Sequence, residues 1–195
     1  MHAATERPVE AHWSLLQHCL EIAQFFEAPL VRLFAFWRAG TLTPERETAI
    51  VEMLEHALPY AERTGITMGL ENEHACQVGT VHELAQILRH FQSPYLKGIW
   101  DPGNAFLLDE SAEHGYAACQ PMVMHIHIKD GVRQPDGSVR WVIVGEGDIR
   151  YPKHLRQIAE SGYNGFLSLE THARLEGLSP TDISRQCLYA LTQML

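Results

Sequence analysis

The sequence has few basic residues and no long apolar run. Its 195 residues include 15 Lys and Arg against 24 Asp and Glu, which gives a formal net charge of −9. Proteins that bind phosphate backbones need concentrated positive charge, and no Lys/Arg cluster occurs here, so a nucleic-acid partner is not expected. No uninterrupted apolar stretch is long enough to cross a bilayer, so a membrane protein is not expected either.

Cysteine pairs and glycine-rich loops are also absent. The four cysteines are widely spaced and form no CxxC motif, which favours reduced thiols in a cytoplasmic protein. The opening residues, MHAATERPVEAH, are polar and lack the apolar core of a signal peptide. No linker rich in Pro, Gly or Ser divides the chain, so residues 1–195 are predicted to form a single domain.

Strand-like and helix-like segments alternate along the chain. Strands are predicted at residues 30–36, 66–71, 96–101, 122–128 and 166–170. Helices are predicted at 12–27, 44–65 with a kink or break at Pro59, 80–91, 111–119, 152–162 and 179–194. The irregular segment 131–149 contains a PDG turn signal that is typical of a small hairpin.

This alternation predicts right-handed parallel βαβ units of the α/β class. The alternatives are a doubly wound sheet and a (β/α) barrel. A glycine-rich phosphate loop follows none of the predicted strands, which disfavours the nucleotide-binding form of the doubly wound sheet.

Potential metal ligands stand at or near the ends of four predicted strands, as Glu71, Asp101, His127 and Glu170. The carboxyl ends of parallel strands face one crevice, so these side chains are expected to meet. Burying three carboxylates together is costly, and a divalent cation removes that cost. Three oxygens and one imidazole suit Mn²⁺, Mg²⁺, Co²⁺ or Zn²⁺. His125 shares a strand face with His127, so spacing alone leaves either histidine as the ligand.

Six motifs occur in order along nearly the whole chain: VRLFAFWR, LEN, WDPGN, HIHIKD, GEGDI and GYNGFLSLE. With them the chain resembles the sugar phosphate isomerase/epimerase family, the xylose isomerase-like TIM barrels. The resemblance implies a partial (β/α) barrel of the TIM type, with about five parallel strands and alternating helices. It also implies one divalent metal ion, with Mn²⁺ first among the candidates, held by Glu71, Asp101, His127 and Glu170.

The same resemblance implies an enzyme that isomerises or epimerises a small keto sugar or sugar-like polyol. Glu71 and Glu170 are the implied catalytic residues, which move protons through an enediolate. Related activities are the dehydration of inositol-like ketones (an inosose dehydratase-like lyase) and the isomerisation of hydroxypyruvate. The abasic-site endonucleases of the superfamily fit poorly, because they need a basic DNA face and a further histidine where this chain has Asn104.

Four further residues are substrate-binding candidates. Asn104 stands where some keto-sugar epimerases have a substrate-contacting histidine, and Arg133 where they place a substrate-binding arginine. Arg133 could equally be a solvated loop charge. Lys129 could bind substrate or pair with a neighbouring acid. Arg32 could face the barrel mouth or serve as a buried ion-pair partner.

Five predicted strands are fewer than the eight of a complete barrel, which has about 250 residues. By the resemblance, the first three βα units of the family are expected to be missing from this chain. An open barrel exposes a strand edge, so a homo-oligomer is expected. A truncated barrel that binds metal, sugar or a partner without catalysis is the alternative to an enzyme.

Overall fold

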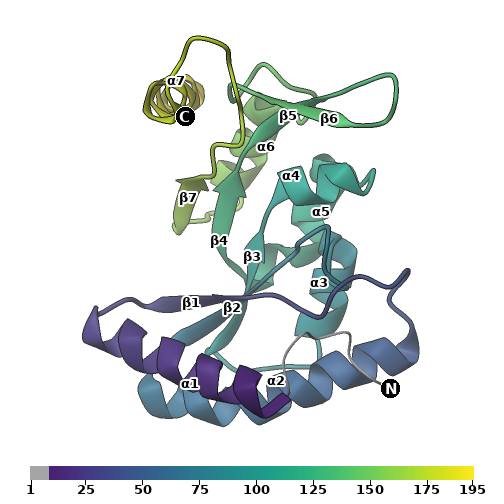
Figure 1. The fold of residues 1–195 in the computed structure, drawn as a ribbon, viewed down its shortest axis with the longest axis vertical. Helices are drawn as coiled ribbons and strands as arrows, with labels where there is room; N and C mark the ends of the chain where they lie inside the picture. Colours follow the sequence, from purple (N-terminus) through teal and green to yellow (C-terminus); the bar gives the residue numbers. More distant parts are fainter. Residues whose placement is uncertain (1–8) are drawn as a thin grey trace.

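The computed structural model describes residues 9–195, and the segment in which no signal peptide was expected lies largely outside them. Five parallel strands form one sheet in the order β1-β2-β3-β4-β7, as Figure 1 shows. Their bounds are β1 Leu30–Leu33, β2 Thr67–Glu71, β3 Leu96–Trp100, β4 Val123–Ile128 and β7 Phe166–Leu169. All five predicted strands are present, with shifted ends.

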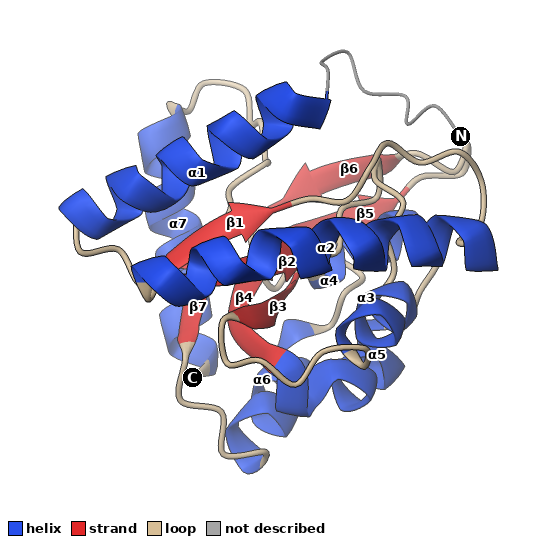
Figure 2. Ribbon diagram, turned by 90° about the horizontal axis from the view of Figure 1, so that it is seen from below, coloured by secondary structure: helices blue, strands red, loops and turns tan. Residues whose placement is uncertain are grey.

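Helices cover the outer side of this curved sheet, as Figures 1 and 2 show together. They are α1 Val9–Phe25, α2 Pro44–Thr64, α3 Val81–Leu88, α5 Ala112–Cys119, α6 Tyr151–Glu160 and α7 Pro180–Met194, with a 3-10 turn η1 at Gln120–Met122. A further short helix, α4 Pro102–Leu107, lies beside the carboxyl ends of the strands. The sheet and its outer helices form a half-barrel, which confirms the predicted partial TIM-barrel architecture.

Of the kink or break predicted at Pro59, the structure of helix α2 excludes the break. Thr43 caps it by accepting a hydrogen bond from the backbone N–H of Arg46 at 3.4 Å, and Gly65 ends it with a φ of 70°. Pro59 lies inside the helix, yet the helix continues through it, so the proline makes no break. Apolar residues on both sides of the proline are buried in the core, and this packing outweighs the lost hydrogen bond; they are Ile50, Leu54, Ala57 and Ala61.

The start of α3 is fixed by a capping box, as predicted from Thr80 and Glu83. The Glu83 carboxylate accepts the backbone N–H groups of Thr80 at 3.0 Å and Gly79 at 2.9 Å. Arg38 donates to both oxygens of the same carboxylate, at 3.0 and 2.8 Å. One side chain therefore joins the loop after β1 to the first turn of α3.

Two short elements lie beside the carboxyl ends of the strands. The predicted hairpin is present as β5 (Asp130–Arg133) paired antiparallel with β6 (Val139–Val142). Helix α4 was not predicted; it begins directly after β3, where Asp101 caps it and Pro102 takes the first helical position. The five residues of the WDPGN motif therefore contain the end of β3 at Trp100, the cap Asp101 and the start of α4 at Pro102.

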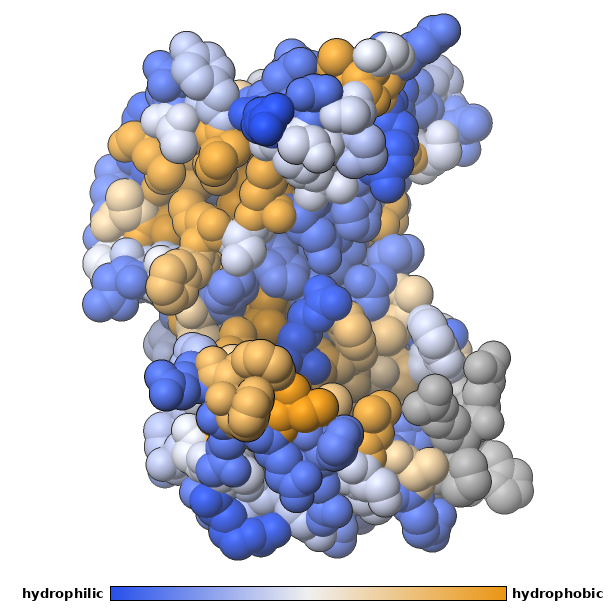
Figure 3. Space-filling view, turned by 60° about the vertical axis from the view of Figure 1, so that its left-hand side comes forward, coloured by the Kyte–Doolittle hydropathy of each residue, from blue (hydrophilic) through white to orange (hydrophobic). Residues whose placement is uncertain are grey.

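The half-barrel is open on one side. Strands β1 and β7 are the outer strands of the sheet, and Figure 3 shows a hollow between the part that contains α1 and α2 and the part that contains α7. Apolar side chains such as Phe34, Trp37 and Phe166 are exposed beside these strands, and an apolar groove of about 500 Å³ runs along β1. Oligomerisation stays a prediction. Among residues 9–195, no helix has the length and apolar character needed to cross a membrane.

Replacement of Glu83 by Gln is expected to lower the free energy of unfolding by about 2 kcal/mol, because it weakens the cap and the Arg38 pair. Burial raises the pKa of Glu83, but the bonds from Arg38, Thr80 and Gly79 outweigh burial and hold it below 4.5. A lowered folded-state pKa stabilises the protein above the unfolded value, and the effect is lost as pH falls through the folded one. Urea unfolding should therefore show a wild-type advantage at pH 7 that shrinks below pH 4.5. An equal advantage at pH 3 would contradict this account.

Candidate metal centre

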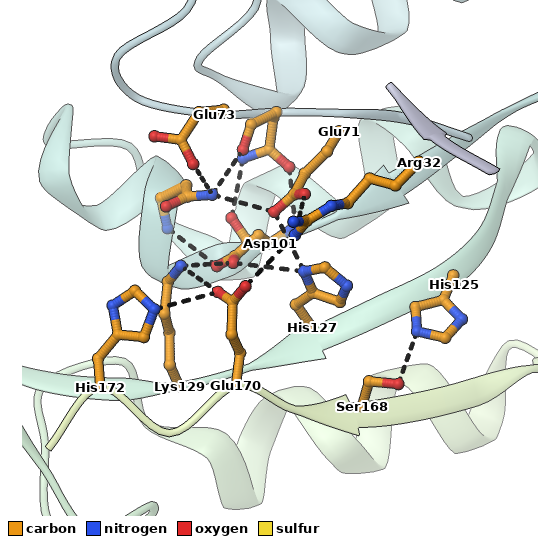
Figure 4. A network of polar contacts seen from close by, with 12 residues as sticks. Arg32, Glu71, Glu73, Asp101, His125, His127, Lys129, Ser168, Glu170 and His172 are labelled. Atoms are coloured by element: carbon orange, nitrogen blue, oxygen red, sulfur yellow. Dashed lines mark hydrogen bonds and ion pairs between the residues drawn. The ribbon is translucent and has the colours of Figure 1, made fainter. Parts of the chain in front are cut away.

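The four predicted ligands meet at the carboxyl ends of the strands. One ligand atom from each of Glu71, Asp101, His127 and Glu170 lies within 4.8 Å of the others. Figure 4 shows their side chains pointing toward one another from β2, the end of β3, β4 and the end of β7. Glu71 and Asp101 are almost fully buried, whereas the Glu170 side chain is 31% exposed. The cluster therefore has one accessible side.

Glu71 is held from several directions. Its Oε1 accepts a hydrogen bond from the Asn104 side-chain amide at 3.2 Å and lies 3.1 Å from Nδ1 of His127. Its Oε2 accepts from Arg32 at 3.1 Å. Asn104 also donates to the carbonyl of Asn72, which fixes the amide behind the carboxylate. Glu71 thus has little freedom to turn away from the cluster.

Asp101 serves both the helix and the cluster. Its Oδ1 accepts the backbone N–H of Asn104 at 2.9 Å as the cap of α4. Its Oδ2 is buried without a hydrogen bond of ordinary geometry and has Lys129 Nζ 2.8 Å away. Asn72 fixes the backbone by accepting from the Asp101 N–H and donating to its carbonyl, both at 2.8 Å. Burial raises the pKa of Asp101, and Lys129 opposes that rise.

Glu170 is paired with two cations. Lys129 Nζ donates to its Oε2 at 2.7 Å, and Arg32 donates to its Oε1 at 3.4 Å. Burial raises the pKa of Glu170, but the bond and charge of Lys129 outweigh burial and hold it below its ordinary value. Burial also acts on Lys129, where it lowers the pKa. The charges and hydrogen bonds of Asp101 and Glu170 raise that pKa by more, so Lys129 is a cation. Glu170 is therefore a carboxylate at neutral pH.

The structure separates the two histidines of β4. His127 directs Nδ1 at Glu71, and its pKa is raised because the acids of the cluster outweigh its burial. His125 lies two residues earlier, and its Nε2 is 2.7 Å from the Ser168 hydroxyl, outside the cluster. Among the residues that the structure describes, His127 is the only histidine in the metal-holding group.

These residues fit a divalent cation. They offer three carboxylates and one imidazole nitrogen, and one buried oxygen, Asp101 Oδ2, accepts no hydrogen bond. Hard divalent ions prefer oxygen ligands, and zinc accepts the same mixture. A cation here would also offset the repulsion between carboxylates brought so close together. The cluster is thus a candidate site for one metal ion.

The substrate-binding candidates have different surroundings. Arg32 and Lys129 both reach the cluster, as described above. Asn104 is 1% exposed and bonds to Glu71, so it lies behind the ligands and not at an open mouth. Arg133 pairs with Asp109 at 2.7 Å and lines a cavity of about 410 Å³ to which none of the four ligands contributes. The structure therefore places Arg133 apart from the cluster.

Sequence reasoning missed His172 as a neighbour of the site. Its Nε2 lies 3.5 Å from Glu170 Oε2, and its ring packs edge-on against Trp141 of β6 with ring centroids 5.4 Å apart. The position two residues after Glu170, in LETH, was the only available signal. The hairpin therefore adds an aromatic side chain beside the accessible ligand.

The GEGDI motif is explained by a buried carboxylate in the hairpin. Asp130 accepts the backbone N–H groups of Gly131 and Gly145, each at 2.9 Å, and of Gly147 at 3.1 Å and Ile149 at 3.4 Å. A Cβ atom at Gly147 would overlap Asp130 Oδ1, so only glycine fits there. The motif therefore fixes the loop that follows the hairpin, next to Lys129.

The sequence model of the xylose isomerase-like TIM barrel family matches residues 2–191. The chain belongs to this family. No curated protein matches the sequence. The match covers almost the whole chain, so the fold and the family agree.

Solved structures agree on the fold. A D-tagatose 3-epimerase-like protein is 20% identical, with a TM-score of 0.77 over 95% of this chain and 68% of its own. The 3-keto-D-glucoside 4-epimerase from E. coli is 18% identical, with a TM-score of 0.76 over 93% and 70%. The IOLI protein with a zinc atom is 18% identical, with a TM-score of 0.82 over 97% and 72%. At such identities the likeness establishes a common fold.

Replacement of Asp130 by Asn is expected to lower the free energy of unfolding by about 2–3 kcal/mol, because an amide group would face two backbone donors that now bond to a carboxylate oxygen. Urea denaturation measures this loss. Asp136→Asn, on the exposed hairpin turn, provides the matched control and should change stability by less than about 0.5 kcal/mol. Equal effects from the two substitutions would refute the role of Asp130.

Proposed function

We propose that the chain is a divalent-metal-dependent isomerase or epimerase of a small keto sugar or sugar-like polyol. The supporting observation is the cluster of three carboxylates and one imidazole, in which two carboxylates belong to glutamates from distant strands. Glu71, Asp101, His127 and Glu170 would hold the ion. When bound, the ion would polarise the substrate carbonyl and orient neighbouring oxygens.

The proton transfers are assigned to Glu71 and Glu170. They come from strands β2 and β7, which β3 and β4 separate, so the two carboxylates approach the centre of the cluster from different sides. One carboxylate removes the proton from the carbon beside the carbonyl, and the other returns a proton to the opposite face of that carbon. This return gives an epimer. If the proton instead goes to the former carbonyl carbon, and the hydroxyl proton of the first carbon moves to the former carbonyl oxygen, the product is an isomer.

The fixed surroundings support these roles. Asn104 and Arg32 hold Glu71 by hydrogen bonds of 3.2 and 3.1 Å, and this arrangement keeps the carboxylate in place without substrate. Glu170 is a carboxylate at neutral pH and is the more accessible of the two, which suits a base that substrate can reach. The epimerases among the structures of similar fold favour a sugar as the substrate class. Zinc in the IOLI structure favours a bound divalent ion.

Metal analysis tests the centre. Purified protein dialysed with Mn²⁺ is expected to retain one ion per chain, measured by mass spectrometry of the metal content. Glu170→Gln should weaken binding at least about tenfold, because even changes behind the ligands commonly cost 10–100-fold. Glu160→Gln, at an exposed position of α6, supplies a control with the same chemical change. Wild-type protein without bound metal after supplementation with Mn²⁺ or Zn²⁺ would disprove the site.

Hydrogen exchange tests the chemistry. In ²H₂O, wild-type protein is expected to incorporate deuterium at the carbon beside the carbonyl of at least one sugar in a keto-sugar panel. Glu71→Gln and Glu170→Gln should each slow this exchange by about 10²-fold or more, the usual contribution of a general acid or base. Mass spectrometry follows the incorporation, with Glu160→Gln as control. Metal binding without exchange across the panel would favour a barrel that binds its ligand without turnover.

A further inference from the structure

A buried lysine occupies a position between two of the proposed ligands. Lys129 Nζ lies 2.8 Å from Asp101 Oδ2 and 2.7 Å from Glu170 Oε2. Figure 4 shows the ammonium group beside both carboxylates. The side chain is 3% exposed, so solvent contributes little to the charge balance around it. Its ammonium group thus contacts one carboxylate oxygen of each of two residues that are proposed to hold the ion.

The structure leaves space for this side chain and fixes its backbone. A Cβ atom on Gly103, in the first turn of α4, would lie 2.5 Å from Lys129 Cγ and 2.9 Å from its Cε, so the glycine leaves room for the lysine stem. The Tyr151 hydroxyl accepts the Lys129 N–H at 3.3 Å and donates to its carbonyl at 2.8 Å. The ammonium position is therefore determined by the fold.

Charge explains why a cation at this point matters. Three carboxylates face one another, and among the residues that the structure describes Lys129 and Arg32 are the Lys and Arg side chains paired with them. One net negative charge remains when His127 and His172 are neutral. Arg32 is 44% exposed, so water screens its charge, whereas Lys129 acts inside the protein. Without Lys129, Asp101 would be a buried carboxylate that keeps only the imidazole of His127, 3.8 Å away, as a neighbour able to carry positive charge.

We propose that Lys129 is a tethered counter-ion that keeps the metal-free cluster assembled, and that a divalent ion must displace its ammonium group from Asp101 and Glu170. The second half of this proposal rests on the proposed metal binding. Lys129 then has opposite effects on two measurable quantities. It stabilises the metal-free protein, and it weakens the affinity for the ion, because its positive charge repels the incoming cation.

Lys129→Met, which keeps the length of the side chain and removes its charge, tests both effects. In metal-free protein, its Tm should fall by roughly 5 °C or more, because a buried carboxylate loses its partner. Calorimetric titration should show a Kd for Mn²⁺ at least about tenfold lower than that of wild type. Lys97→Met, on β3 and four residues before Asp101 in the chain, removes the same charge roughly 13 Å from Asp101 along the backbone and should change neither quantity.

If Lys129→Met binds Mn²⁺ as wild type does or more weakly, the claim that the ion displaces the ammonium group is refuted. If its Tm is unchanged, the claim that Lys129 stabilises the metal-free cluster is refuted. If Lys129→Met does not fold, the double variant Lys129→Met/Glu170→Gln decides the matter, because it removes one opposing charge and should be more stable than the single variant. A double variant that is no more stable would overturn the proposal. If wild type binds no Mn²⁺, the proposed function fails, whereas the Tm of the metal-free variants still tests the counter-ion.

Discussion

Repulsion between carboxylates is the constraint on which this structure depends. Parallel strands deliver the side chains at their carboxyl ends to one rim, and here three of the four side chains are acids whose ligand atoms lie within 4.8 Å. Bringing charges of one sign together in a poorly solvated place is costly, so positive charge must be supplied nearby. Arg32 and Lys129 supply part of it. A divalent ion would supply more charge from a single point.

A layer of neutral groups holds the acids in position. Asn72 fixes the backbone of Asp101, and Asn104 fixes the side chain of Glu71. A buried polar group without a partner costs about 1–3 kcal/mol, so these amides are stable only in the arrangement that satisfies them. Asp101 also caps α4, so the hydrogen bond that starts this helix also orients the carboxylate. The site is therefore built by the same bonds that build the loops around it.

The strand pattern and the meeting of Glu71, Asp101 and Glu170 could be predicted from the sequence, because both depend on periodicity and strand ends. The choice of His127 over His125 comes from the family resemblance. The surroundings could not be predicted. Lys129 and Arg133 are both cations that follow β4, yet one turns into the cluster and the other pairs with Asp109, since packing across the sheet decides their direction. Pro59 predicted a kink or a break, and the buried face of α2 prevents the break. Helix α4 is only six residues long, too short for its periodicity to be recognised.

The close approach of Gly103 and Lys129 connects two motifs that are distant in the chain. A side chain at 103 would meet the stem of the lysine, and a shorter residue at 129 would leave a gap beside the helix. The two positions are therefore expected to vary together among relatives. A family member with a larger residue at the first position should have a small residue at the second and should balance its acids with some other cation. The residues at these two positions would then show which cation balances the carboxylates at the carboxyl ends of the strands in each relative.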